Sequence, residues 1–272
     1  MTTSLKVGFI GTGKIATALT EGFCLHKDPA LLIALSPRNQ GRAQALQERF
    51  KDRVTVCESN QEVADRSDYL FICLLPEVSP TIHDAALPLL NLKPTHGIIS
   101  AMASVAMSDL LGQLSINPSD SDHRVCRCVP LPSSASREGP ILVYPPATRC
   151  QPVLDILGTC IVCQTEAELK PLICLTGMLS PFHHLQATLD DFAQSKGVDS
   201  KTSGKFVASL FSATAALAES ELDIKSNTFS DMAHHAATPG GLNEMAVNSM
   251  IADGVYESTR QALQDTLDRL EA

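Results

Sequence analysis

Several features that would assign this 272-residue chain to a particular class of protein are missing from its sequence. It contains no run of about 18 apolar residues, so we expect no membrane-spanning helix. It also lacks a basic footprint, because the formal net charge is -9 and the pI is near 5.3; this argues against a nucleic-acid-binding surface. No secretory signal precedes the first predicted strand, and no internal repeat or low-complexity linker is visible. The composition therefore predicts a globular, cytoplasmic protein.

A metal-binding cysteine pattern is missing as well, although the chain contains nine cysteines. Cys160 and Cys163 form a CxxC pair, but no second CxxC and no histidines at ligand spacing accompany it. The apolar runs around the cysteines are typical of buried thiols, which behave as small hydrophobic residues. We therefore expect reduced thiols and no metal site.

The first part of the chain alternates strand-like and helix-like runs. Strands are predicted at 5–11, 31–36, 54–57, 68–75, 96–101, 124–129, 140–144 and 159–163. Helices are predicted at 14–26, 39–51, 60–66, 79–91, 105–114 and 150–157. This β-α-β rhythm is typical of an α/β protein with a doubly wound, mostly parallel sheet.

A dinucleotide-binding fingerprint follows the first predicted strand. Residues 5–16 read LKVGFIGTGKIA, an apolar strand that runs into Gly11-x-Gly13-x-x-Ala16. Gly11 permits the tight turn, Gly13 lets the backbone approach a pyrophosphate, and Ala16 keeps the helix close to the strand. The helix then presents free N–H groups and its positive dipole end to the phosphates. The sequence therefore predicts a Rossmann-type nucleotide-binding domain.

An acidic residue is missing from the end of the second predicted strand, where NAD-preferring folds hold the ribose 2′-hydroxyl. Ser36 and Arg38 stand there instead. A hydroxyl and a guanidinium suit a 2′-phosphate, which arginine can bind in bidentate fashion. The alternative is a surface turn with a solvated arginine. The sequence favours NADP(H) over NAD.

From about residue 166 onward only helical patterns remain. They cover 167–186, 188–196, 201–222, 227–235, 242–253 and 255–271. The segment 204–221 is apolar on more than one face, which indicates burial by other helices, including those of a second subunit. We therefore predict two domains, a nucleotide-binding domain over residues 1–164 and a helical domain over 165–272.

Motifs in order along the whole chain resemble those of the pyrroline-5-carboxylate reductase family. Residues 8–16 match its opening GFIGxGxMA motif, and Ser36-Pro37-Arg38 resembles its cofactor-specificity turn. Residues 60–68, from Asn60 to Asp68, resemble its N-x-E-V segment, and Leu75-Pro76 stands at its Lys-Pro. Residues 127–133 resemble R-x-M-P-N-T-P, residues 176–182 resemble S-G-S-G-P-A-Y, and residues 237–243 resemble the signature loop T-S-P-G-G-T-T.

The resemblance implies a reductase of a cyclic imine that uses NADPH and forms L-proline. It also implies a homodimer or a ring of dimers built through the helical domain, and an active site between the nicotinamide and that domain. The implied cofactor-binding residues are Gly11, Thr12, Gly13, Lys14, Ile15, Ser36, Arg38, Asn60, Leu75, Pro76 and Ala101. The implied substrate-binding residues are Thr238, Gly240, Gly241, Asn243 and His183, of which Thr238 and Asn243 are the candidate catalytic residues.

The signature loop is suited to bind the carboxylate of a substrate. Its two glycines expose backbone N–H groups at the start of a helix, and such groups bind anions. Thr238 adds a hydroxyl. The alternative is an ordinary Pro-Gly-Gly turn that caps a helix. Asn243 replaces a family hydroxyl that is a candidate for hydrogen bonding to the imine nitrogen, and an amide does not readily shuttle a proton.

Other departures from the family pattern predict a bulkier and more apolar pocket. Leu131 replaces an asparagine, Met178 and Leu179 replace small residues, and Phe182 replaces a tyrosine. Two histidine pairs lie close to the matched motifs, His183-His184 and His234-His235. If histidines face the pocket, they can act as a general acid or bind an acidic group of the substrate; otherwise they lie at the surface or at the dimer interface.

Three functions remain open from the sequence. The first is NADPH-dependent reduction of pyrroline-5-carboxylate. The second is reduction of another imine or of a 2-keto acid by a divergent enzyme. The third is a nucleotide-binding dimer without catalysis, which the intact glycine turn and Pro239-Gly240-Gly241 loop disfavour.

Overall fold

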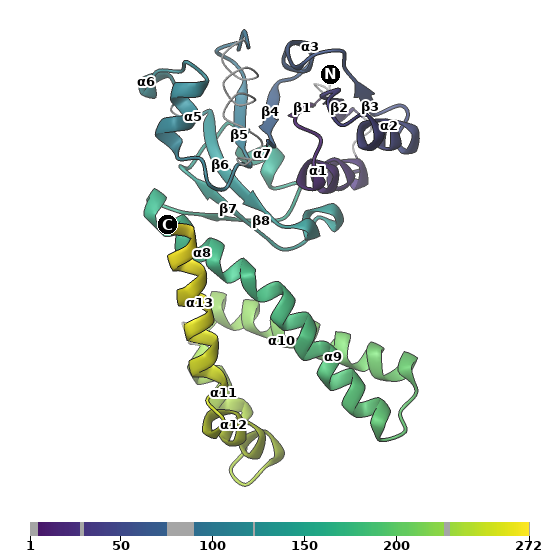
Figure 1. The fold of residues 1–272 in the computed structure, drawn as a ribbon, viewed down its shortest axis with the longest axis vertical. Helices are drawn as coiled ribbons and strands as arrows, with labels where there is room; N and C mark the ends of the chain where they lie inside the picture. Colours follow the sequence, from purple (N-terminus) through teal and green to yellow (C-terminus); the bar gives the residue numbers. More distant parts are fainter. Residues whose placement is uncertain (1–4, 28–29, 75–89, 122, 226–228, 272) are drawn as a thin grey trace. The chain divides into compact units, whose positions relative to one another are not determined.

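The chain folds into two compact units, shown in the ribbon of Figure 1. The structure, a computed structural model, describes residues 5–27, 30–74, 90–121, 123–225 and 229–271. The first unit ends at Leu172 and the second begins at Ile173. This boundary lies a few residues after the one expected from the sequence, between residues 164 and 165. None of the helices in the described ranges is long and apolar enough to cross a membrane.

A sheet of eight strands in the order β3-β2-β1-β4-β5-β6-β7-β8 forms the centre of the first unit. The strands are β1 (Lys6–Ile10), β2 (Leu32–Leu35), β3 (Val54–Val56), β4 (Tyr69–Ile72), β5 (Gly97–Ser100), β6 (Val125–Pro130), β7 (Pro140–Tyr144) and β8 (Thr159–Val162). Every neighbouring pair is parallel except β6 and β7, which are antiparallel. The predicted fold class and all eight predicted strands are confirmed.

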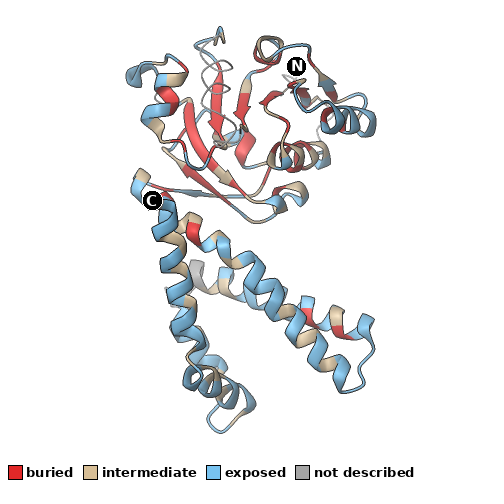
Figure 2. Ribbon diagram, in the orientation of Figure 1, coloured by how far each residue is buried: buried red, intermediate tan, exposed pale blue. Residues whose placement is uncertain are grey.

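Both faces of the central strands are buried, as expected for parallel strands covered by helices, whereas the edge strand β8 is mostly exposed (Figure 2). On one face Phe9 of β1 stacks on Phe71 of β4 with ring centroids 5.1 Å apart, and Phe23 of the helix α1 (Lys14–Leu25) meets Phe71 edge-on at 5.8 Å. On the other face Ile10 belongs to the same apolar cluster as Leu110 of α5 (Met107–Gln113). Neighbouring residues of β1 therefore anchor both helical layers.

The other helices of the first unit are short. They are α2 (Gln40–Arg49), α3 (Asn60–Asp65), α6 (Pro118–Ser121), α7 (Gln151–Leu154) and the 3-10 turns η1 (Pro132–Ser136) and η2 (Glu166–Glu168). The helix predicted at 79–91 falls on residues that lie outside the described ranges, apart from its last two.

A buried ion pair ties the end of the first unit to its sheet. The guanidinium of Arg127 on β6 is almost wholly buried and pairs with the carboxylate of Glu166. It also donates to the carbonyl oxygen of Ala103 at 2.7 Å, while Glu166 accepts the backbone N–H of Met107 at 2.8 Å. This pair holds residue 166 in the first unit, which explains why the observed boundary lies after residue 164.

The second unit consists of helices alone. They are α9 (Leu179–Ser195), α10 (Ser200–Lys225), α11 (Phe229–Ala236), α12 (Leu242–Ala252) and α13 (Val255–Glu271), preceded by η3 (Thr176–Met178) and by α8 (Leu169–Leu175), which crosses the boundary. The prediction of separate helices at 167–186 and 188–196 was wrong, because the chain breaks at η3 and α9 then continues without interruption. Pro171 and Pro181 are each the third residue of a helix, and proline is tolerated only in the first turn, so the helices must begin just before them.

The second unit buries few of its own apolar side chains (Figure 2). Phe206 on α10 is 68% exposed, and Leu242 and Met245 on α12 are 80% and 67% exposed. Large exposed apolar side chains in such number are typical of a surface that another chain covers. The exposure fits the expected burial by helices of a second subunit.

The nine cysteines are all unpaired. Cys126, Cys128 and Cys150 are fully buried in one core cluster, and Cys73 and Cys160 pack against it. Burial raises the pKa values of Cys73 and Cys160 to about 12, so these groups stay protonated at neutral pH. Within the described ranges no group of three or more potential ligands is arranged to hold a metal.

His96 makes the stability of the fold dependent on pH. It is almost fully buried and its Nδ1 accepts the backbone N–H of Lys93, and burial lowers its pKa. A lowered pKa favours the neutral ring in the folded state, so the unfolded state binds more protons once the pH falls below about 6.5. We expect the free energy of unfolding, measured with urea, to fall between pH 7.5 and pH 5.5, and to fall less in His96→Asn. The exposed His123→Asn is the control, and an equal decrease in all three proteins would contradict this role.

Candidate active site

The glycine turn after β1 is held by the end of β2. Gly11 has φ +93°, a conformation that favours glycine, and a Cβ added there would lie 2.6 Å from the carbonyl oxygen of Cys73. Its N–H donates to Ser36 Oγ at 2.9 Å. Thr12 Oγ1 donates to the carbonyl oxygen of Ser36 at 3.1 Å. Two hydrogen bonds therefore fix the turn against the neighbouring strand.

Ser36 has a structural role in the turn, and its contact with the cofactor stays a prediction. It is fully buried, and its hydroxyl accepts the N–H of Gly11 within the protein. Thr12 is buried in the same way and bonds to the same residue. The side chains of these two residues support the turn from within the protein.

The start of α1 is open to an anion. Gly13 is the N-cap residue and supplies no capping side chain, and the first turn of α1 contains no acidic residue. A Cβ added to Gly13 would meet no heavy atom within 4 Å, so the protein leaves space directly beside this backbone. Lys14 is exposed and Ile15 half-buried in the same turn. Uncapped N–H groups together with free space fit a phosphate group.

Arg38 lies exposed two residues after the buried Ser36. It lies in the bend between β2 and α2, which begins at Gln40. Among the described residues no carboxylate pairs with its guanidinium. The side chain is therefore available for a 2′-phosphate, as the sequence predicts.

Two further predicted cofactor-binding residues lie at the carboxyl edge of the parallel strands. Ala101 follows β5, and its N–H donates to the carbonyl oxygen of Ile72 at 2.9 Å. Asn60 opens α3, which follows β3. In open α/β sheets ligands bind along this edge. Leu75 and Pro76 lie outside the described residues.

The signature loop, residues 237–243, connects α11 to α12 in the second unit. Gly240 has φ +71° and Gly241 is the N-cap of α12. The N–H of Gly241 donates to the carbonyl oxygen of Thr238 at 2.8 Å, which closes the turn. The N–H of Gly240 donates to Oε2 of Glu244 at 2.7 Å. Both glycine N–H groups that the sequence assigns to a substrate anion are thus bonded within the chain.

Asn243 also bonds within the loop. Its Nδ2 donates to the carbonyl oxygen of Ala236 at 2.9 Å, so the amide links the start of α12 to the end of α11. The second hydrogen of Nδ2 and the acceptor oxygen Oδ1 are not used in this bond. Asn243 therefore supports the loop while it keeps one donor and one acceptor group.

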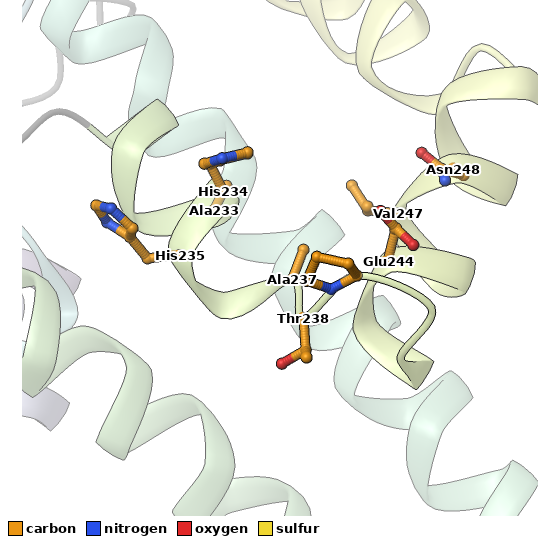
Figure 3. Close-up of a pocket in the computed structure, with 9 residues that line it drawn as sticks. Ala233, His234, His235, Ala237, Thr238, Glu244, Val247 and Asn248 are labelled. Atoms are coloured by element: carbon orange, nitrogen blue, oxygen red, sulfur yellow. The ribbon is translucent and has the colours of Figure 1, made fainter.

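A pocket of about 520 Å³ opens beside the signature loop (Figure 3). It is lined by Ala233, His234, His235, Ala237, Thr238, Pro239, Glu244, Val247 and Asn248. The lining combines two histidines of α11, the loop itself and one face of α12. The structure thus brings the second histidine pair together with Thr238, one of the two predicted catalytic residues.

Sequence reasoning missed Glu244, and it placed His183 in the substrate site. Glu244 directly follows the last residue of the signature loop, and a glutamate near the start of a helix is a recognisable capping signal. His183 lies exposed on α9, where its Nδ1 is 2.8 Å from Oε1 of Gln186, and it is not among the residues that line the pocket.

Family models match both units in the expected order. Residues 6–104 match the model described as NADP oxidoreductase coenzyme F420-dependent. Residues 173–272 match pyrroline-5-carboxylate reductase dimerisation, and this match begins where the second unit begins. The second match supports self-association of the chain through its helices.

Individual proteins agree with these models. Pyrroline-5-carboxylate reductase 2 of Homo sapiens is 27% identical over 290 aligned residues, which cover 96% of this chain and 85% of the human protein. The structures of pyrroline-5-carboxylate reductases from Streptococcus pyogenes and Coxiella burnetii share 18% and 17% identity with this chain, cover 98% of each chain, and give TM-scores of 0.76 and 0.74. At such identities the structures support the fold alone. The dimerisation model over the second unit and the human relative over nearly the whole chain support membership of the pyrroline-5-carboxylate reductase family.

Proposed function

We propose that the chain reduces the C=N bond of a cyclic imine with NADPH, in the manner of the pyrroline-5-carboxylate reductases. The chain is an NADP-dependent oxidoreductase acting on C=N, which its family and its first domain support. The observation that carries the proposal is the uncapped start of α1 beside the turn that Ser36 holds in place. The identity of the imine substrate is a separate question, and we take pyrroline-5-carboxylate as the compound with which other substrates are compared.

The residues present fit the cofactor. The open backbone at Gly13 and the N–H groups of Lys14 and Ile15 would bind the pyrophosphate, and Arg38 would bind the 2′-phosphate. When bound, NADPH supplies the hydride that adds to the imine carbon, while the nitrogen takes up a proton and becomes the amine. A protonated cyclic imine accepts hydride readily, so the chain's own residues mainly orient the ring and exclude water.

The pocket beside the signature loop is the proposed place of the substrate. Thr238 offers a hydroxyl, and two imidazole side chains, those of His234 and His235, line the pocket with it. Asn243 follows the loop glycines and offers an amide group. A homodimer, alone or within a ring of dimers, completes the site in this proposal. A cytoplasmic location and the absence of nucleic-acid and membrane partners remain predictions from composition.

The activity is tested by following NADPH oxidation by the purified chain with pyrroline-5-carboxylate, with other cyclic imines and with 2-keto acids. We expect turnover of at least one cyclic imine. Turnover of 2-keto acids alone would overturn the imine assignment. NADPH binding without turnover of any compound would instead indicate a nucleotide-binding dimer without catalysis.

Arg38→Ala tests the choice of cofactor. Hydrogen bonds to charged groups contribute about 1.5–3 kcal/mol, so the Kd of NADPH should rise about 10- to 100-fold while that of NADH changes little. Lys51→Ala removes an equal charge from an exposed residue after α2 and serves as the control. Equal weakening of NADPH and NADH, measured by fluorescence titration, would remove Arg38 from the 2′-phosphate site.

Gly13→Ala tests the pyrophosphate site. The backbone of Gly13 has φ -88°, which alanine adopts, and the space beside it is empty; the fold should therefore keep its stability or gain about 0.4–1 kcal/mol. The added methyl group would occupy the space of the ligand, so we expect NADPH affinity to fall about tenfold or more. Gly41→Ala also adds a methyl group in open space and should leave NADPH affinity unchanged. Unchanged affinity in Gly13→Ala would show that the dinucleotide does not approach this backbone.

A further inference from the structure

The signature loop carries its own carboxylate. Glu244 lies in the first turn of α12, where the N-terminal N–H groups and the helix dipole favour a negative charge. Its Oε2 accepts the N–H of Gly240 at 2.7 Å. The neighbouring N–H of Gly241 is bonded to the carbonyl oxygen of Thr238. Each N–H has a single hydrogen to donate, so neither glycine is free to bind a substrate anion.

The rest of the pocket does not compensate for this negative charge. Its nine lining residues, all in the described part of the chain, include no lysine or arginine, and only His234 and His235 can become cationic. Glu244 is itself one of the lining residues. A substrate carboxylate that enters the loop must therefore displace a like charge or remain beside it, and both are unfavourable.

Asn243 does not compensate for this charge either. Its amide is neutral, and one hydrogen of its Nδ2 is already bonded to the carbonyl oxygen of Ala236. The negative charge of Glu244 therefore sets the electrostatic preference of the loop.

We propose that Glu244 is a specificity-determining residue that occupies the anion position of the signature loop, so that the enzyme prefers cyclic imines without a carboxylate. This inference rests on the proposed imine reductase activity and narrows its substrate class. It reverses the expectation that Gly240 and Gly241 anchor a substrate carboxylate.

Two compounds that differ only in the carboxylate test the preference, namely pyrroline-5-carboxylate and 1-pyrroline. We expect kcat/KM to be about tenfold or more higher with 1-pyrroline in the unmodified enzyme. Glu244→Gln keeps an oxygen that accepts the N–H of Gly240 and removes only the charge. It should reduce this ratio, chiefly by lowering the KM for pyrroline-5-carboxylate. Glu244→Ala also frees the N–H and should reduce the ratio further.

The control is Glu219→Gln, which removes the same charge from an exposed position on α10 that does not line the pocket. It should leave the ratio unchanged. Circular dichroism and the oligomeric state establish that each variant is folded, and Glu244→Gln suffices if Glu244→Ala does not fold. A preference of the unmodified enzyme for pyrroline-5-carboxylate, or an unchanged ratio in folded Glu244→Gln, overturns the proposal.

Binding of the two matching amines separates this inference from the proposed activity. Pyrrolidine and L-proline differ by the same carboxylate, and calorimetry in the presence of NADP⁺ measures their affinities without turnover. Tighter binding of pyrrolidine, which Glu244→Gln weakens relative to proline, supports the role of Glu244 even if no imine is reduced. Tighter binding of proline to the unmodified enzyme contradicts that role even if imines are reduced.

Discussion

The proposed cofactor site in the first unit depends on one constraint, the hydrogen bond from the Gly11 N–H to Ser36 Oγ. It joins the carboxyl ends of β1 and β2, and it holds the glycine in a conformation that other residues rarely adopt. The turn in this position directs the chain into α1 with no capping side chain. A buried serine thereby produces an unsatisfied helix start, and an unsatisfied helix start is what a phosphate requires.

The two glycine-marked helix starts of this chain are used in opposite ways. At α1 the N-terminal turn contains no acidic residue, and the backbone beside Gly13 faces empty space. At α12 the chain supplies Glu244, whose carboxylate accepts the N–H of Gly240. The first helix start is open to an external anion, and the second is occupied by an internal one. Similar glycine motifs therefore do not imply similar ligands, because the side chain a few residues later decides whether the N–H groups are free.

Most of the fold followed from local patterns, whereas the site depended on particular contacts. Apolar runs of strand length predicted all eight strands, because the central strands are covered on both faces. The break at η3 was missed although Pro181 marks it, since the apolar periodicity continues across residues 176–178 and outweighed the proline. Ser36 and Asn243 were identified as site residues, and their contacts with ligands stay predictions. The sequence contains no sign that their hydrogen bonds close on the chain's own backbone, because those bonds link β2 to the turn after β1 and α12 to the end of α11.

Self-association would strengthen the electrostatic character of the signature loop if the partner covers the start of α12. Leu242 and Met245 flank Asn243 and Glu244 on this helix, and both are largely exposed in the single chain. A partner that covered these apolar side chains would also remove water from the glutamate between them. Because charge interactions strengthen as the surrounding medium becomes less polar, the proposed exclusion of anions by Glu244 would then be stronger in the dimer. The same turn of α12 would couple the dimerisation surface to the proposed substrate preference.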